Sequence, residues 1–382
     1  MDAHLHLLVV ATNYVETTGG LEGHLQRLLP LLVERGVAVT ITYLGTARAP
    51  YTDEHGVRVH PLARQFDFRD IMALPSPRDW SAFTRTVRRG KLHAGRVTHV
   101  STQTRFFPTS WLGMRLGSSL GVPVVHTEHG GGYVATSSRL VGAAAKAVDL
   151  TMGRQVLRGA TKVLAVSEAS CDFVRRLSGV TASQFNNGVD IARWLPAGDA
   201  APRQGDERSL VFVGRLVPEK GWRAFLAVAR ACRNDGFAGP VVLLGDGFEL
   251  AEARRQAAAL GLHDAQLPGR VTADVVRGHL RGGVLVNPTT ASEGFQLTLV
   301  EAMAAGAAIV SYAVGGTDEV RRVPGADVSV VPKGDVVGLV RATRSALGRP
   351  APSLGRDALD AWDWAKVADA YVDVLGEVSQ AR

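Results

Sequence analysis

The sequence predicts an α/β fold with two domains, each built on a mainly parallel sheet. In the first half of the chain, short apolar runs alternate with segments of helical periodicity, which is the pattern of β-α-β units. A length of 382 residues is enough for two domains that each bury a core. The same alternation resumes after residues 194–208, a stretch rich in Pro, Gly and charge that we interpret as a linker.

Apolar runs give the expected strands of the first domain, which are Leu5–Ala11, Val37–Leu44, Val57–Pro61, Val97–Thr102, Val122–Thr127 and Lys162–Val166. Between the first two, leucines at helical spacing follow Gly19 and Gly20 and predict a helix, which Pro30 should kink or shorten. Glycines at the carboxyl end of a strand let a ligand approach the backbone closely. On local grounds, a tight turn without a ligand is an equal alternative.

Two histidines, His126 and His129, lie at or just beyond the end of the expected strand Val122–Thr127. A histidine there could hydrogen-bond a ligand hydroxyl, accept a proton or bind a metal. The spacing in HTEH is too short for a helical zinc motif, so a metal site is not predicted. We interpret His126 as a buried group with a backbone partner and keep His129 as the candidate.

The second half places two cations on one loop. The expected strand Leu210–Val213 leads into GRLVPEKG, so Arg215 and Lys220 precede a helix. Such residues are usually only solvated, but together they suit diphosphate binding and stabilisation of a leaving group.

Residues 287–306, NPTTASEGFQLTLVEAMAAG, place two carboxylates around the start of a predicted helix that ends at Gly306. Glu293 falls on the loop ahead of the helix, and Glu301 about two turns inside it. A helix start is a ready phosphate site, and its free N–H groups are expected at Gly294, Phe295 and Thr298. A carboxylate on each side could hold hydroxyl groups flanking a diphosphate. A nucleotide sugar has this layout.

The run SEGFQLTLVEAMAAG resembles the signature of family 4 retaining glycosyltransferases of the GT-B fold. The arrangements GR-x4-KG and GG-x-E-x-H and the His129–Gly130 pair also resemble motifs of this family, in the same order. The resemblance implies two Rossmann-like domains facing across a cleft, with a C-terminal helix crossing back to the first domain. The expected parts are an acceptor-side domain (1–188), a nucleotide-sugar-binding domain (189–360) and the C-terminal helix (361–382).

The resemblance also implies a reaction and its residues. A hexose or N-acetylhexosamine would pass from a nucleotide-diphosphate sugar, with UDP as the expected carrier, to a hydroxyl of a saccharide, glycolipid or small molecule. No cofactor or metal is expected. The implied catalytic residues are His129, Arg215, Lys220 and Glu293. The implied donor-binding residues are Gly20, Arg270, Val271, Gly294, Phe295, Gln296, Leu297, Thr298 and Glu301. Candidate acceptor contacts are Gly19, Gln103 and Arg105.

Gln296 departs from the family pattern, in which Gly or Pro is common at this position. It adds a side chain near the expected sugar site and is expected to bear on donor choice.

Two alternatives stay open at this point. One is a phosphorylase-like or pseudo-glycosyltransferase relative, although only Lys333 and Lys366 follow the glutamate pair and neither lies in a glycine-rich cofactor motif. The other is a nucleotide-sugar-binding protein that has lost transfer activity, which the retained carboxylates and cations argue against.

Composition bears on the remaining classes. The net charge of +7 allows an acidic partner or a membrane surface, but no basic run is interleaved with aromatics, so nucleic-acid binding is not predicted. No apolar stretch approaches the roughly 20 residues that span a bilayer, and the N-terminus does not have the pattern of a signal peptide. Cys171 and Cys232 show no framework spacing. A cytoplasmic protein is expected, with peripheral contact at the inner face of the membrane left open.

Overall fold

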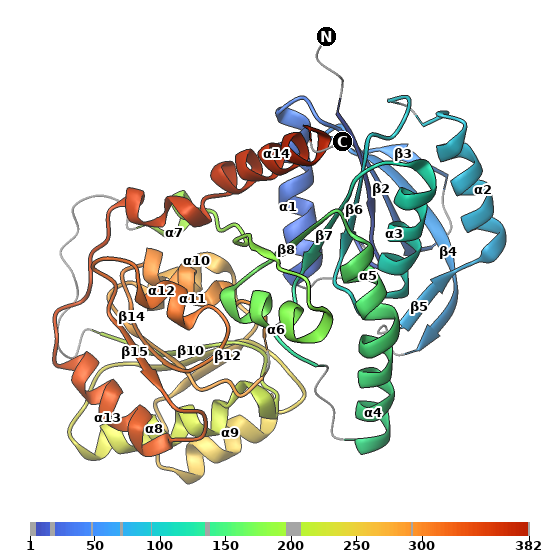
Figure 1. Cartoon of the computed structure of the whole chain (residues 1–382). Helices are drawn as coiled ribbons and strands as arrows, with labels where there is room; N and C mark the ends of the chain where they lie inside the picture. Colours follow the sequence, from blue (N-terminus) through green and yellow to red (C-terminus); the bar gives the residue numbers. More distant parts are fainter. Residues whose placement is uncertain are drawn as a thin grey trace. The chain divides into compact units, whose positions relative to one another are not determined.

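The structure is a computed structural model that describes residues 5–15, 20–46, 49–68, 72–92, 94–133, 138–195, 208–291 and 293–380. The chain forms two compact units, Met1–Gly188 together with Trp364–Arg382, and Val189–Asp363. Each unit is α/β with a mainly parallel sheet, so the predicted fold class is confirmed (Figure 1). The C-terminal helix belongs to the first unit.

The first unit has a sheet in the order β3-β4-β2-β1-β6-β7-β8-β9, with β5 paired to β4. Neighbours from β4 to β9 in this order pair in parallel, whereas β3 and β5 run antiparallel to β4. The strands are β1 (His6–Val10), β2 (Ala38–Gly45), β3 (Tyr51–Thr52), β4 (Arg58–Phe68), β5 (Met72–Pro75), β6 (His99–Gln103), β7 (Val124–Glu128), β8 (Lys162–Ala165) and β9 (Ser183–Gln184).

Helices cover this sheet, and α14 from the end of the chain packs against α1 in its core through buried Val367, Tyr371 and Leu375 (Figure 1). The helices are α1 (Gly20–Glu34), α2 (Pro77–Arg88), α3 (Pro108–Leu120), α4 (Arg139–Val148), the π-helical η1 (Asp149–Gly153), α5 (Arg154–Gly159), α6 (Glu168–Ser178) and α14 (Trp364–Gln380).

Of the two effects expected of Pro30, a kink or a shorter helix, the shortening does not occur, because α1 continues to Glu34. Leu28 and Leu29 precede the proline and Leu32 follows it, and all three are buried in one core. Packing on both sides of Pro30 holds the helix together despite the lost backbone hydrogen bond.

The second unit has a fully parallel sheet in the order β12-β11-β10-β13-β14-β15. The order reverses between β10 and β13, which makes this point the switch at which open α/β sheets bind ligands. The strands are β10 (Leu210–Val213), β11 (Val241–Leu244), β12 (Gln266–Gly269), β13 (Val284–Asn287), β14 (Ala308–Tyr312) and β15 (Val328–Val331). The helices are α7 (Ile191–Trp194), η3 (Pro218–Lys220), α8 (Trp222–Asn234), α9 (Leu250–Ala259), α10 (Ala273–Leu280), α11 (Leu297–Ala304), α12 (Thr317–Arg321), α13 (Val336–Leu347) and η4 (Arg356–Trp362).

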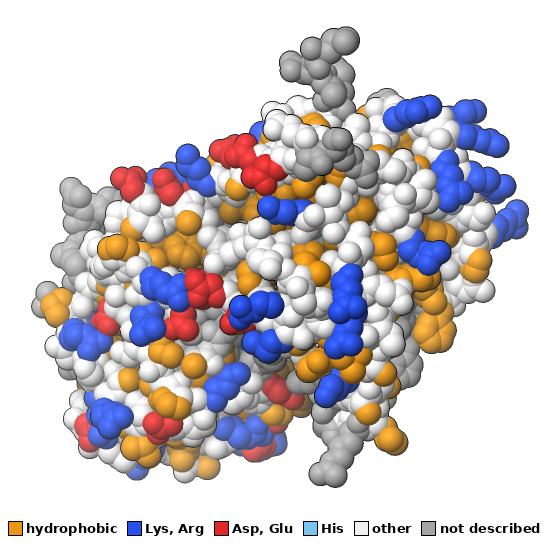
Figure 2. All heavy atoms as spheres, in the orientation of Figure 1, with side chains coloured by type: hydrophobic (Ala, Val, Ile, Leu, Met, Phe, Trp, Pro, Cys, Tyr) orange, Lys and Arg blue, Asp and Glu red, His pale blue; other side chains and the backbone are white. Residues whose placement is uncertain are grey.

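Positive side chains gather over α2 (Figure 2), where Arg78, Arg85, Arg88, Arg89 and Lys91 are exposed. The helix turns its apolar residues to the core and leaves these charges outside. Separately, no helix within the described ranges combines the length and the apolar character needed to cross a membrane.

Candidate active site

The loops after β10 and β13 bring Lys220 and Glu293 together, although they are 73 residues apart in the sequence. The Nζ of Lys220 donates a hydrogen bond to Oε1 of Glu293, and both side chains are mostly buried. The carbonyl of Glu219 accepts hydrogen bonds from the N–H of Thr290 at 2.8 Å and of Ala291 at 3.2 Å. The backbone therefore ties the two loops together at the switch point of the sheet.

Glycines allow these loops to pack without space for a side chain. Gly221 has a φ of +76°, and a Cβ there would lie 2.0 Å from the carbonyl oxygen of Pro288. A Cβ on Gly315, after β14, would lie 2.2 Å from the carbonyl oxygen of Gly294. Only glycine fits such contacts, so the loops that carry Lys220 and Glu293 are held in a fixed relation.

Arg215 lies just after β10, on the loop that also carries Lys220, and its side chain is exposed. Its guanidinium has no hydrogen-bond or ion-pair partner among the residues that the structure describes. A second cation at this edge of the sheet is therefore available to an anion.

The start of α11 offers backbone donors. Its N-cap residue is Gln296, and no side chain caps the helix. The first N–H groups of a helix have no intrahelical partner, so those of Leu297 and Thr298 suit a phosphate. Gly294 and Phe295, just before the helix, are buried. This helix start is where the resemblance described above implies contacts with the donor.

Gln296 is held by the neighbouring strand ends. Its Oε1 accepts a hydrogen bond from Nδ2 of Asn287 at 2.5 Å, and Asn287 also donates to Oγ of Ser311 at 2.9 Å. The Nε2 of Gln296 is buried and has no hydrogen-bond partner in the described parts of the chain. The residue that departs from the family pattern is thus fixed in place with one donor left over.

Glu301 lies in the second turn of α11. Burial raises the pKa of Glu301 to about 7, and the charge of Arg193 partly opposes this rise. Arg193, in α7, was missed by the sequence reasoning, because no local pattern links it to a glutamate more than a hundred residues away. Arg270 and Val271, which the resemblance implies as donor-binding residues, follow β12, and the Arg270 side chain is exposed.

In the first unit, His129 follows β7 and belongs to a chain of hydrogen bonds. Its Nε2 lies 2.9 Å from Oε1 of Gln103, whose Nε2 donates to Oγ of Ser101 at 2.9 Å. Ser101 in turn shares a 2.8 Å hydrogen bond with the hydroxyl of Tyr371 on α14. Because the amide oxygen of Gln103 only accepts, Nε2 of His129 carries the proton and Nδ1 keeps its lone pair.

A second histidine, His24 of α1, packs edge-to-face on His129 with ring centroids 5.1 Å apart. Burial lowers the pKa of His129 to about 4, although the Glu128 carboxylate works against this. Burial also lowers the pKa of His24 well below its ordinary value. The two rings are therefore neutral at physiological pH. His24 is the last residue of GG-x-E-x-H, so the sequence motif already contained the residue that packs on His129. Gly20 begins α1, and Gly19 lies outside the described residues.

The acceptor role predicted for Arg105 does not fit its position. Its side chain is 2% exposed and forms ion pairs with Glu128 at 2.8 Å and Asp149 at 3.0 Å. Its Nη2 also donates to the carbonyl of Gly132 at 2.9 Å. Burial alone would raise the pKa of Glu128, but Arg105 and His126 bring it down to about 2. Arg105 thus serves the core of the first unit, where an acceptor cannot reach it.

Two other sequence interpretations need correction. Gln103, the other described candidate for an acceptor contact, is 3% exposed, and its amide atoms bond Ser101 and His129. It orients His129 instead of facing an acceptor. His126 is buried as expected, but its Nδ1 bonds the side chain of Thr102 at 2.9 Å and not a backbone group.

No metal site is apparent within the described ranges, since they contain no group of three or more His, Cys, Asp or Glu side chains placed to hold an ion.

The protonation of His129 is testable by NMR. We expect its ring to stay neutral between about pH 5.5 and 8, as the Nε2–H tautomer, because burial disfavours the charged form and Gln103 accepts the Nε2 proton. Long-range ¹⁵N–¹H spectra report both properties. In Gln103→Met the two tautomers should mix, whereas Gln184→Met, at an exposed glutamine of β9, should change nothing. A titration of His129 near its ordinary pKa would refute the assignment.

Comparison with known proteins agrees with this arrangement of two mainly parallel sheets. Residues 18–193 match the family model described as Glycosyltransferase Family 4, and residues 207–349 match Glycosyl transferases group 1. The fold is GT-B, and the class is that of the glycosyltransferases. More narrowly, the chain belongs to the family 4 glycosyltransferases.

Individual relatives span nearly the whole chain. Glycogen synthase of Mycobacterium tuberculosis is 27% identical over 97% of this chain and 94% of the relative. D-inositol 3-phosphate glycosyltransferase of Saccharomonospora viridis is 26% identical over 95% and 90%. Among solved structures, Anabaena HepE in complex with UDP aligns with a TM-score of 0.70 at 16% identity, over 98% of this chain and all of that one, which supports the fold.

Proposed function

We propose that this protein is a retaining glycosyltransferase that moves a hexose or N-acetylhexosamine from a UDP-sugar to a hydroxyl group. The observation that carries the proposal is the Lys220–Glu293 pair beside the uncapped start of α11, at the switch point of the second sheet. A cation and a helix start suit a diphosphate, and the adjoining carboxylate suits hydroxyl groups. The UDP bound to HepE favours uridine as the base.

In the proposed reaction, the acceptor oxygen forms a bond to the anomeric carbon as the bond from that carbon to the diphosphate breaks. Arg215, Lys220 and the start of α11 stabilise the departing diphosphate, an electrostatic contribution worth several kcal/mol in comparable sites. A phosphate oxygen of the donor takes the acceptor proton on the same face, so the anomeric configuration is retained. Glu293 orients the hexose, and neutral His129 supports its hydroxyls.

The test uses the full chain with UDP-, GDP- and ADP-sugars. Thermal shift should select the uridine compounds, and proton NMR of the transferred product should show the anomeric configuration of the donor. Binding without hydrolysis or transfer would instead favour the alternative of a nucleotide-sugar-binding protein that has lost activity. An inverted product would overturn the retaining assignment.

Metal independence gives a separate prediction. We expect transfer in excess EDTA to proceed at the untreated rate, because cations of the protein and a helix start take the place of a divalent ion at the diphosphate. The measurement is the initial rate before and after chelation. Loss of activity that Mg²⁺ restores would contradict the proposal.

Two finer points also belong to the proposal. The acceptor is a saccharide, a glycolipid or a small molecule. The names of the two relatives, glycogen synthase and D-inositol 3-phosphate glycosyltransferase, both fall within this range. A cytoplasmic location, with α2 as the surface for any peripheral membrane contact, stays a prediction.

A further inference from the structure

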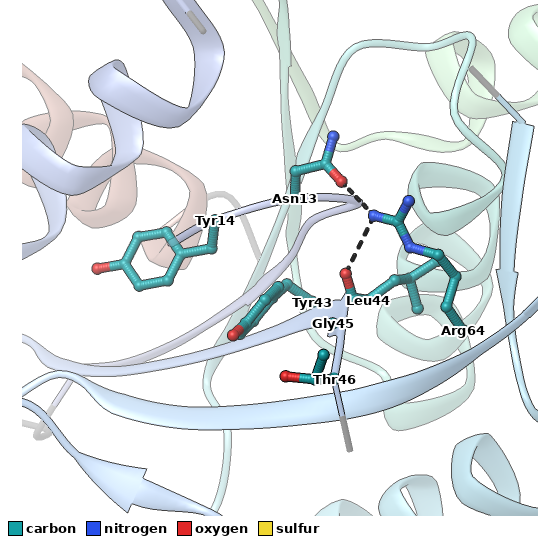
Figure 3. A pocket seen from close by; sticks show the side chains of 7 residues that line it. All are labelled: Asn13, Tyr14, Tyr43, Leu44, Gly45, Thr46 and Arg64. Carbon is teal, nitrogen blue, oxygen red and sulfur yellow. Dashed lines mark hydrogen bonds between the residues drawn. The ribbon is translucent and has the colours of Figure 1, made fainter. Parts of the chain in front are cut away.

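A cavity of about 310 Å³ opens at the carboxyl edge of the first sheet (Figure 3). Asn13 and Tyr14 come from the loop after β1, Tyr43 to Thr46 from the end of β2, and Arg64 from β4, which are three neighbouring parallel strands. This edge is where open α/β sheets bind ligands.

Helix α1 connects the cavity to the candidate active site of the same unit. Nε2 of Gln26 donates to the carbonyl of Tyr14 at 2.6 Å, and His24, two residues earlier, packs on His129. The cavity wall and His129 are therefore both anchored to the first turns of one helix.

The lining combines an aromatic side with a polar side. The rings of Tyr14 and Tyr43 pack edge-to-face with centroids 5.9 Å apart, and the Asn13 amide and the Arg64 guanidinium lie opposite them (Figure 3). Tyrosine rings offer an apolar face to the C–H groups of a sugar, while amide and guanidinium groups bond its hydroxyls. The volume is at the lower end of the roughly 300–1,000 Å³ of small-molecule sites, which suits one ring.

The charge of the cavity determines whether a neutral or an anionic ring would bind there. Nη1 of Arg64 forms an ion pair with Asp67 at 2.5 Å, and Nη2 donates to Oδ1 of Asn13 at 2.6 Å and to the Leu44 carbonyl at 3.2 Å. The positive charge is thus compensated by a carboxylate that would repel a phosphate. Burial, reinforced by the Asp53 carboxylate, raises the pKa of Tyr14, so that phenol is neutral.

We propose that this cavity is the acceptor subsite and that it takes one neutral polyhydroxylated ring, a sugar or cyclitol unit without a phosphate. The proposal rests on the proposed transferase function and narrows its acceptor. None of its residues was identified from the sequence.

Saturation-transfer NMR on the full chain tests ring binding directly, with methyl α-D-glucoside, myo-inositol and glucose 6-phosphate as probes. We expect a neutral probe to bind at millimolar concentration and better than glucose 6-phosphate. Asn13→Ala should weaken this binding about tenfold, since one buried hydrogen bond is lost, and should leave the thermal shift produced by UDP as in wild type, which shows that the variant is folded. Absence of binding by both neutral probes, or unchanged binding in Asn13→Ala, would overturn the proposal.

Asp67→Asn tests the charge argument. It leaves Arg64 without its carboxylate and should raise the affinity for glucose 6-phosphate at least about fivefold. Asp172→Asn is the matched control, because Asp172 pairs with Arg175 at the same three-residue spacing on α6. A wild-type preference for the phosphate, or no difference between these variants, would favour an anionic acceptor. Failure of UDP-sugars to bind wild type would count against the transferase function alone.

Discussion

Lys220→Ala is expected to lower kcat for sugar transfer by about 100-fold or more. The lysine side chain is mostly buried beside Glu293, on a loop whose path Gly221 fixes against Pro288. A cation held there requires no rearrangement as charge develops on the diphosphate, so its removal acts on the transition state more than on substrate binding. Initial-rate kinetics with separate kcat and KM measure the effect.

Controls separate this role from a purely structural one. Lys162→Ala removes another lysine–glutamate pair, formed with Glu377 at 3.4 Å, and should leave kcat unchanged. If Lys220 only positions Glu293, then Glu293→Gln should cost as much and the double variant no more. If Lys220 binds the diphosphate, Lys220→Ala alone should weaken UDP binding. A Lys220→Ala enzyme with wild-type turnover would falsify the mechanism.

The second large effect concerns Glu301 and pH. Burial raises the pKa of Glu301 to about 7, against the smaller opposing influence of Arg193. If this carboxyl holds the ribose hydroxyls, its ionised form is the better acceptor. We expect UDP-glucose affinity to rise about tenfold between roughly pH 6 and 8 and then level off. Calorimetry measures this affinity. Any change with pH comes from the protein, because the diphosphate ester of UDP-glucose does not titrate near neutral pH.

The raised pKa of Glu301 has the opposite effect on the stability of the unliganded protein, which it lowers as pH rises. A carboxyl whose folded-state pKa is raised stabilises the fold below its unfolded pKa and loses that contribution as pH rises through about 7. Tm should therefore fall as pH rises from about 4.5 to about 7 in wild type, and it should fall less in Glu301→Gln. Glu252→Gln, on exposed α9, is the matched control and should follow wild type. UDP-glucose binding without pH dependence in wild type would remove Glu301 from the ribose site.

Local patterns in the sequence predicted the parts of the fold that depend on local chemistry. The apolar run Leu210–Val213 coincides with β10, and Gly306 follows α11 with a φ of +73°, as a helix-ending glycine should. The expected strand Val57–Pro61 was too short, because β4 continues to Phe68 by pairing with β5. That pairing depends on a partner that composition alone does not reveal.

The site was predictable where one short motif carried it and not where distant residues meet. Glu293 and Glu301 share one motif, and Lys220 and Arg215 another, but no pattern joined Lys220 to Glu293. Arg105 illustrates the opposite case. As a charged residue after a strand it resembled a ligand contact, yet Asp149, 44 residues later, completes its burial. Ion pairs across such separations are decided by tertiary packing.

The chain leaves its first unit at Gly188 and returns to it at Trp364, so the second unit is covalently an insert within the first. Val367, Tyr371 and Leu375 of the returning helix complete the core of the first unit. In the proposed function the second unit binds the donor, so donor preference would belong to residues 189–363 and acceptor preference to the two segments that flank them. Recombination that exchanges donors needs two crossovers, one at each junction, and a single crossover would give the first unit a foreign α14 in its core.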